Sequence, residues 1–138
     1  MAVTLQGMVL IDGEASGTVL KLAAPISFWG GVDPNTGRIT QPAHPNFKDS
    51  ISGKVLVLPG MIGSSSSSAV MLELIGNGKA PVALIMASID AILALGVVAA
   101  GELDLPDLPV VQCAVDQFVT GQSADISAGG AIRLGDGR

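Results

Sequence analysis

The chain has 138 residues, 49% of them hydrophobic and 14% charged, so it has room for one domain, residues 1–138, with a well-supplied core. The formal net charge of −5 and the scattered placement of the seven basic residues argue against nucleic-acid binding. The single cysteine, Cys113, cannot form an intramolecular disulfide and cannot by itself hold zinc or an iron–sulfur cluster, so any metal is expected on another chain.

No membrane span is expected either. The apolar stretch from Ala80 to Ala100 is interrupted by Ser88, Asp90 and Gly96. The first residues lack the basic start and the apolar segment of a secretory signal, so a cytoplasmic location is expected.

The first elements are predicted to be strands, over Val3–Leu10 and Gly17–Leu22. Between them lies Asp12-Gly13, a pair that favours a hairpin turn because both turn positions must tolerate a positive φ. The following segment, residues 23–52, is rich in Pro, Gly and Asn, and so long an irregular segment is more often a functional loop than a plain connection. Within it, Asp33 to Gly37 has the Pro and Gly placement of a tight turn.

A buried strand, a loop of glycine and serine, and a helix are predicted next. The strand covers Lys54–Leu58, and five consecutive serines, Ser64–Ser68, follow it closely. The helix has apolar residues at helical spacing from Val70 to Ile75, and Gly76-Asn77-Gly78 is suited to a left-handed cap at its end.

Strands and helices alternate in the second half, which predicts parallel crossovers, whereas the opening hairpin predicts antiparallel neighbours. A mixed α/β sheet or barrel is therefore expected. The predicted elements are strands over Pro81–Met86, Gly96–Ala100 and Pro109–Ala114, a short helix over Ser88–Leu95 capped by Ser88, a final strand or pair of strands over Ala124–Leu134, and a tail from Gly135 to Arg138.

The serine run is the clearest candidate site. A helix start offers unpaired N–H groups and the positive end of the helix dipole, so Gly63 to Ser67 are suited to hold a carboxylate or a phosphate. A serine there is a feeble base without an activator, and the one histidine, His44, has no spacing that recommends it as a partner. Plain N-capping by Ser64 or Ser65 is the structural alternative. The patterns of a Walker loop and of a Gly-x-Ser-x-Gly hydrolase are absent.

The pair Phe28-Trp29 is expected to plug the core, because large aromatic side chains dominate core burial. The pair Gly30-Gly31 after it suits a place where the backbone passes close to a ligand or another chain. Cys113 is expected to be a small core residue rather than a nucleophile. Three carboxylates are expected to face solvent: Asp90, Asp104 and Asp107.

Several strings of residues, taken in order, resemble the small subunit of aconitase X. They are Pro25–Pro34 (PISFWGGVDP), Thr36–Ile39, His44-Pro45, Gly53–Pro59, Gly63–Ser65 and Lys79–Pro81. The resemblance implies a swivelling β/β/α domain like the mobile domain of aconitase, with a mixed, barrel-like sheet and flanking helices. It also implies docking on a separate large subunit that carries an iron–sulfur cluster, with no cofactor in this chain.

The same resemblance implies a hydro-lyase that removes water from a small hydroxy acid, either cis-3-hydroxy-L-proline or mevalonate 5-phosphate. The family's catalytic serine falls on Ser64, with Ser65 as the alternative, and it would abstract the proton α to a carboxylate. The substrate is expected to contact a larger set of residues: Gly63, Ser65, Gly30, Gly31, Asp33 and His44.

One departure from the family concerns the substrate. Members often have arginine just before the Gly-Ser of this loop, and here the position is Ile62. Because arginine is a preferred phosphate clamp, this favours the hydroxyproline reaction. Two other hypotheses stay open, a non-catalytic module that binds an anion and a purely structural interaction domain. Apolar surface meant for the partner is also expected to promote self-association of the chain alone.

Overall fold

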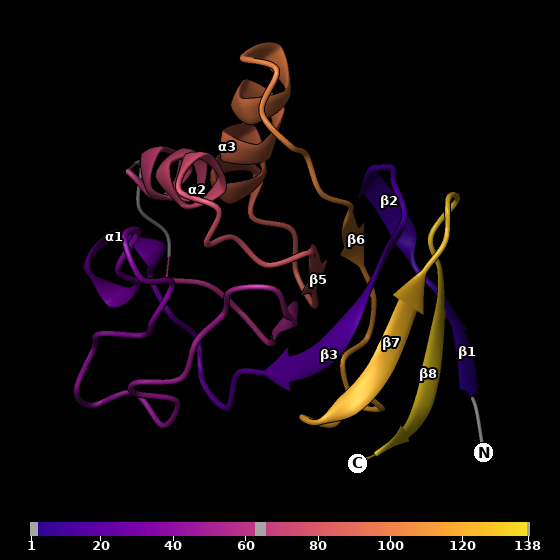
Figure 1. The fold of residues 1–138 in the computed structure, drawn as a ribbon. Coiled ribbons are helices and arrows are strands. Elements are labelled where there is room, and N and C mark those ends of the chain that lie inside the picture. Colours follow the sequence, from indigo (N-terminus) through magenta and orange to yellow (C-terminus); the bar gives the residue numbers. More distant parts are fainter. Residues whose placement is uncertain (1–2, 63–65, 138) are drawn as a thin grey trace.

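The computed structural model describes residues 3–62 and 66–137, and Figure 1 shows how the elements are arranged. In chain order they are β1 (Val3–Gln6), β2 (Met8–Ile11), β3 (Ala15–Lys21), α1 (Phe28–Gly31), β4 (Val55–Leu58), α2 (Ser67–Gly76), β5 (Ala83–Met86), α3 (Ala91–Glu102), β6 (Val110–Gln112), β7 (Gln122–Ile126) and β8 (Ala131–Gly137). Within the described residues, no helix is long and apolar enough to cross a membrane.

The strands form one mixed sheet in the order β1-β8-β7-β3-β4-β5-β6-β2. The four strands β3 to β6 run parallel to one another, and antiparallel strands flank them on both sides. Its two edge strands, β1 and β2, are consecutive in the chain and meet at Gly7, so the sheet curls into a nearly closed barrel. The expected mixed, barrel-like sheet is confirmed.

The predicted hairpin around Asp12-Gly13 is wrong, because β2 and β3 do not pair with each other. Instead β2 pairs with β6, and β3 pairs with β4 and β7. The reason lies at Gly7, whose buried N–H donates to the Gly130 carbonyl at 2.8 Å and whose missing side chain leaves room for Val111. The predicted first strand is interrupted at Gly7, and its second half, β2, crosses to the opposite edge of the sheet.

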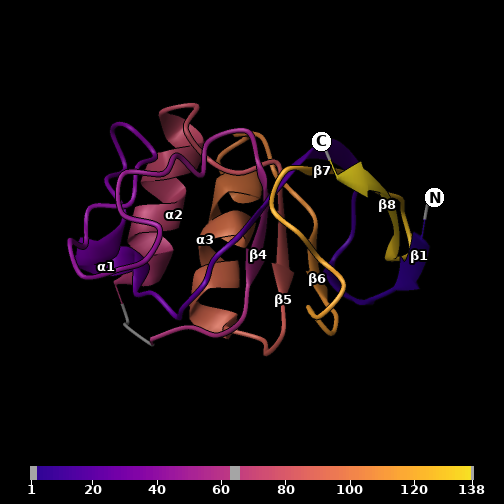
Figure 2. The same cartoon turned by 90° about the horizontal axis from the view of Figure 1, so that it is seen from below.

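The central strands separate two hydrophobic cores, since successive side chains of a strand point to opposite faces. Leu56 and Leu58 of β4 belong to the core under the helices, and Val55 and Val57 to the core inside the barrel. Viewed from below, α2 and α3 lie on one side of β4 and β5, and β7, β8 and β1 lie on the other (Figure 2). This layering, β on β on α, is the architecture that the resemblance implies.

Helix α3 is the largest correction to the predicted elements. The predicted strand Gly96–Ala100 is wrong, because these residues continue the helix to Glu102. The predicted cap Ser88 is also wrong. The N-cap is Asp90, whose Oδ1 accepts a hydrogen bond from the Leu93 N–H at 3.0 Å. At the C-terminus the predicted tail is wrong too, since β8 runs on to Gly137.

Candidate functional site

The candidate site lies at the edge of the sheet where the parallel strands end. Strand β4 leads there into residues 59–62, strand β5 leads into residues 87–90, and the helices α2 and α3 both begin there. A hollow of about 480 Å³ opens between the two connections. It is lined by Gly60 and Met61 on one side and by residues 88–92 on the other.

The serine run divides at the start of α2. The predicted residues Gly63, Ser64 and Ser65 lie outside the described residues, so their roles stay predictions. Ser66 occupies the N-cap position, and Ser67 is completely buried in the first turn. The N-cap position therefore lies later in the chain than the predicted Ser64 or Ser65.

Segment 26–31 runs beside the connection that follows β4. Ile26 forms a parallel bridge with Met61, and the Ile26 carbonyl accepts a hydrogen bond from the Ile62 N–H at 3.1 Å. These contacts hold segment 26–31, which contains Gly30 and Gly31, beside residues 59–62, which precede the predicted Gly63 in the sequence. Gly30 has φ +80° with open space around its Cα, and Gly31 is packed against Ile26.

The aromatic pair behaves as two separate residues. Phe28 is completely buried, as expected, but Trp29 is 62% exposed, so its prediction as a core residue is wrong. Their backbones explain the difference, because Trp29 and Gly30 leave helical geometry and turn the second ring away from the core. Segment 26–31 thus lies beside Met61 through Ile26 and exposes the large apolar side chain of Trp29.

His44 and Asp33 hold the irregular segment in shape. His44 is buried, its Nδ1 accepts from the Asn46 N–H at 3.0 Å, and its Nε2 lies 2.9 Å from the Ala24 carbonyl oxygen. Since Nδ1 accepts, Nε2 must carry the proton and donate, so neither nitrogen is left to accept a serine proton. Asp33 accepts from the N–H groups of Asn35 and Gly37, which confirms the predicted turn. Substrate contacts of both residues stay predictions.

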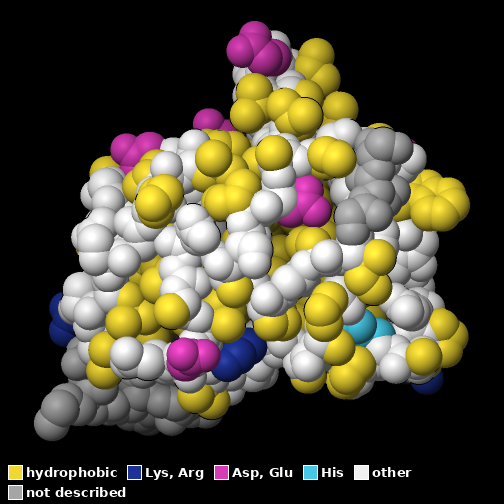
Figure 3. Space-filling view, turned by 180° about the vertical axis from the view of Figure 1, so that it is seen from behind, with side chains coloured by type: hydrophobic (Ala, Val, Ile, Leu, Met, Phe, Trp, Pro, Cys, Tyr) yellow, Lys and Arg dark blue, Asp and Glu magenta, His cyan; other side chains and the backbone are white. Residues whose placement is uncertain are grey.

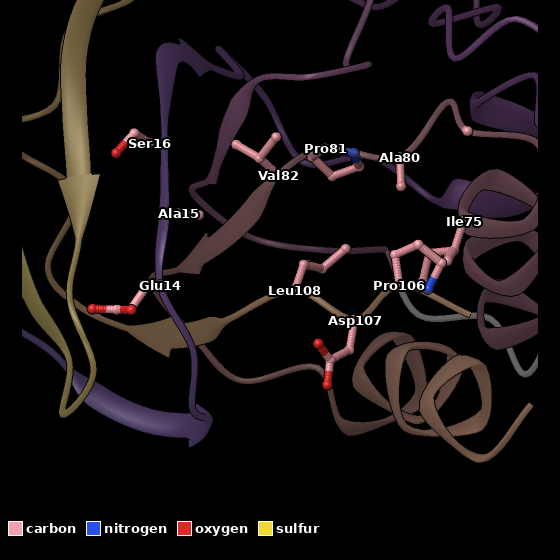
Figure 4. A pocket seen from close by; sticks show the side chains of 11 residues that line it. Glu14, Ala15, Ser16, Ile75, Ala80, Pro81, Val82, Pro106, Asp107 and Leu108 are labelled. Carbon is pink, nitrogen blue, oxygen red and sulfur yellow. The ribbon is translucent and has the colours of Figure 1, made fainter. Parts of the chain in front are cut away.

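A second pocket of about 390 Å³ lies at the opposite edge, where the parallel strands begin. Figure 4 shows its lining, which includes the carboxylates of Glu14 and Asp107. Among the described residues that line it, none is a predicted site residue. Asp104 and Asp107 are exposed, as expected, whereas Asp90 is half-buried because it caps α3 at the other edge. Sequence reasoning missed Asp90 as a cap, although aspartate is a preferred N-cap residue.

Cys113 follows β6 and is half-buried against the barrel core. Its N–H donates to the Met86 carbonyl at 3.0 Å, and desolvation by burial raises the pKa of the thiol. A thiol of raised pKa is a poor nucleophile and a poor metal ligand at neutral pH. One cysteine does not fit an iron–sulfur cluster, and within residues 3–62 and 66–137 no three His, Cys, Asp or Glu side chains gather as a metal site.

Comparison with known proteins gives consistent matches over nearly the whole chain. Residues 4–134 match the sequence profile of the aconitase X swivel domain. A protein of Pseudomonas aeruginosa named cis-3-hydroxy-L-proline dehydratase is 40% identical over 94% of this chain, which spans 21% of that protein's length. A phosphomevalonate dehydratase small subunit of Thermococcus gammatolerans is 38% identical, with 96% of this chain and 98% of that protein covered. The crystal structure of Thermococcus kodakaraensis aconitase X, in its holo form, matches with a TM-score of 0.88 and 33% identity, over 97% of this chain and 99% of that chain.

Proposed function

This chain belongs to the aconitase X swivel-domain family, and from that premise we propose that it is the small subunit of an aconitase X type dehydratase that eliminates water from a small hydroxy acid. The observation that carries the proposal is the family match over residues 4–134. The full-length correspondence with a relative named as a small subunit supports the same assignment. The larger relative, of which this chain spans 21%, supports a partner that supplies the remaining part.

The proposed catalytic residue is Ser64, acting on the proton α to the substrate carboxylate. The start of α2 supports this role, because N–H groups of a first helical turn stabilise an alkoxide or a carboxylate. Asp90 caps α3, and both ring nitrogens of His44, the one histidine of the chain, are hydrogen-bonded to the backbone. A hydroxyl is a weak base without help, so we propose that the partner subunit activates Ser64.

The iron–sulfur cluster expected for the family is placed on that large subunit in this proposal. A cluster takes three or four cysteine ligands, and this chain has Cys113 alone, half-buried beside the barrel core. In this proposal the present chain contributes Ser64, the start of α2 and one wall of the hollow to the active site.

The proposed substrate is cis-3-hydroxy-L-proline. Ile62, 53% exposed, stands where family members often have arginine, and the residues lining the hollow include Asp90 but no Lys or Arg. A phosphate group prefers an arginine clamp, so this side of the site suits an unphosphorylated acid better. Mevalonate 5-phosphate is the second candidate, because the relative of matching length is named for that activity.

The test is to co-express this chain with the aconitase X large subunit of the same organism and to measure water loss from both acids. We expect turnover of cis-3-hydroxy-L-proline that requires both chains and that falls by at least about 10³-fold in Ser64→Ala. Ser65→Ala tests the alternative serine, and Ser16→Ala, at the opposite edge of the sheet, is the matched control. Full activity of Ser64→Ala would refute its catalytic role, and turnover of mevalonate 5-phosphate alone would replace the proposed substrate.

A further inference from the structure

Helix α3 is apolar both on the side that packs against the protein and on the side that faces solvent. From Ala91 to Gly101 it has no charged residue. Its inner face, with Leu93 and Val97, is buried on α2 and the sheet. We define the α3 outer face as Ile92, Leu95 and Val98 of the helix together with Ile89, which precedes the N-cap. Their side chains are 37%, 57%, 48% and 38% exposed, in that order.

Such a helix is unusual on a surface. A helix that faces water normally has a polar outer face, and one that is apolar all round is normally buried. Figure 3 shows hydrophobic side chains exposed over the upper part of this face, where the helices lie, and also over its lower part, with acidic side chains at the top. Contiguous apolar surface of this kind marks contacts with other proteins.

The outer face continues into the candidate site. Ile89 and Ile92, at its lower end, also line the hollow opposite Gly60 and Met61. A chain that covers Leu95 and Val98 would therefore reach the rim of the hollow with the same surface. Covering the face and completing the site are then parts of one contact.

We propose that the α3 outer face docks the large subunit of the dehydratase, through an uncharged, apolar surface of that subunit. The inference rests on the proposed function and adds the surface by which the two chains assemble. In the Pseudomonas aeruginosa relative the matched domain makes up 21% of one longer chain, so the rest of that protein is always attached to it. Permanent interfaces are more hydrophobic than transient ones, and this fits an uncharged helix face.

The test measures the Kd between the two subunits, purified separately, by calorimetry. Leu95→Lys puts a charge at the centre of the face, and Val3→Lys puts the same charge on β1, at the end of the molecule away from the helices (Figure 2). We expect Leu95→Lys to weaken binding by at least about 100-fold and Val3→Lys by less than about twofold, because an unpaired charge in an apolar interface is costly. Circular dichroism and the Tm of each isolated variant check that both fold.

Turnover assays separate the two levels of the proposal. When the large subunit is concentrated enough to saturate the Leu95→Lys variant, we expect the complex to have the wild-type kcat, because Leu95 does not line the hollow. An unchanged Kd for Leu95→Lys, with an active complex, overturns the docking face and leaves the proposed function standing. Loss of self-association in Leu95→Lys with an unchanged Kd assigns the face to a second copy and also overturns the inference. A wild-type chain that neither binds the large subunit nor supports turnover overturns both.

Discussion

Gly96 lies in the middle of α3 at the point where this helix crosses α2. A Cβ placed there would lie 2.5 Å from the Ser68 carbonyl oxygen and 2.8 Å from the Met71 Cβ. Neither neighbour is the end of a flexible side chain, so Gly96→Ala requires the two helices to separate. Gly101, five residues further along the same helix, has nothing within 4 Å of such a Cβ.

The two glycines therefore give opposite expectations for the same change. Replacing a glycine within a helix by alanine gains up to about 1 kcal/mol of helix propensity. Gly101→Ala should keep most of that gain. At Gly96 an overpacking cost of about 1–3 kcal/mol opposes it, and the contact with a backbone oxygen favours the upper end of this range. We expect Gly96→Ala to be destabilised by about 1–2 kcal/mol and the two variants to differ by about 2–3 kcal/mol.

Urea unfolding followed by circular dichroism measures both variants against the wild type. For a domain of this size the expected difference corresponds to roughly 6–10 °C in Tm. If both variants increase the free energy of unfolding by the same amount, α2 and α3 can separate without loss of stability. That result would refute the close crossing at Gly96.

Three further predictions concern single side chains. Asp90→Ala removes the cap of α3 and should lower the free energy of unfolding by about 1 kcal/mol, while Asp90→Asn should restore most of it, as urea titration will measure. His44→Ala leaves the Asn46 N–H and the Ala24 carbonyl without their partner and should cost about 1–3 kcal/mol in the same assay, and an unchanged midpoint would contradict the two ring hydrogen bonds. Because burial raises the pKa of the Cys113 thiol, its thiolate fraction at pH 8 is smaller than in the unfolded chain, so alkylation by iodoacetamide should be slower in the folded protein than in urea, and an equal rate would contradict the burial. The same raised pKa means that the folded chain holds this proton longer, so its contribution to stability should be lost as the pH rises above the usual value of 9.0.

The central strands could be predicted because their signal is local. Residues 55–58 and 83–86 are short apolar runs, and both are buried along their whole length between the helices and the barrel core. A strand covered on both faces needs no polar alternation, so a run of four to eight apolar residues next to turn residues is sufficient evidence for it. Helix α2 was predictable for the same reason, from its periodic apolar residues and the glycines at its end.

The pairing of strands and the crossing of helices depend on contacts between residues distant in the sequence. Predictions from neighbouring residues alone were therefore wrong at two places. Gly96-Val97-Val98 has a breaker and two β-branched residues, as a strand would, yet its glycine is needed for contact with Ser68 and Met71. Asp12-Gly13 has the composition of a hairpin turn, but its aspartate accepts hydrogen bonds from both Gly13 and Gly129, which ties it to the turn between β7 and β8. Neither partner can be inferred from the neighbours of these residues.

The long irregular segment and the serine run were singled out from their composition, and the roles of their residues in a site stay predictions. The bridge between Ile26 and Met61 joins the irregular segment to the connection that follows β4. Phe28 and Trp29 look alike in sequence, and only their backbone angles send one ring into the core and the other outward. The exposure of Trp29 therefore follows from the backbone of this segment and not from the type of residue.

The position of the candidate site follows from the topology. Four parallel strands end at one edge, and the two helices that follow β4 and β5 begin there. Ala91 and Ile92 of α3 line the hollow, so the positive end of this helix lies at it. A helix start suits an anionic group, whereas Asp90 is used as the cap of α3 and His44 holds the irregular segment. The same helix α3 that gives the hollow one wall also presents an uncovered apolar face beside it. In the proposed function this chain contacts the substrate on one side and the large subunit on the other, so separating the two proposed subunits should abolish turnover without unfolding this one.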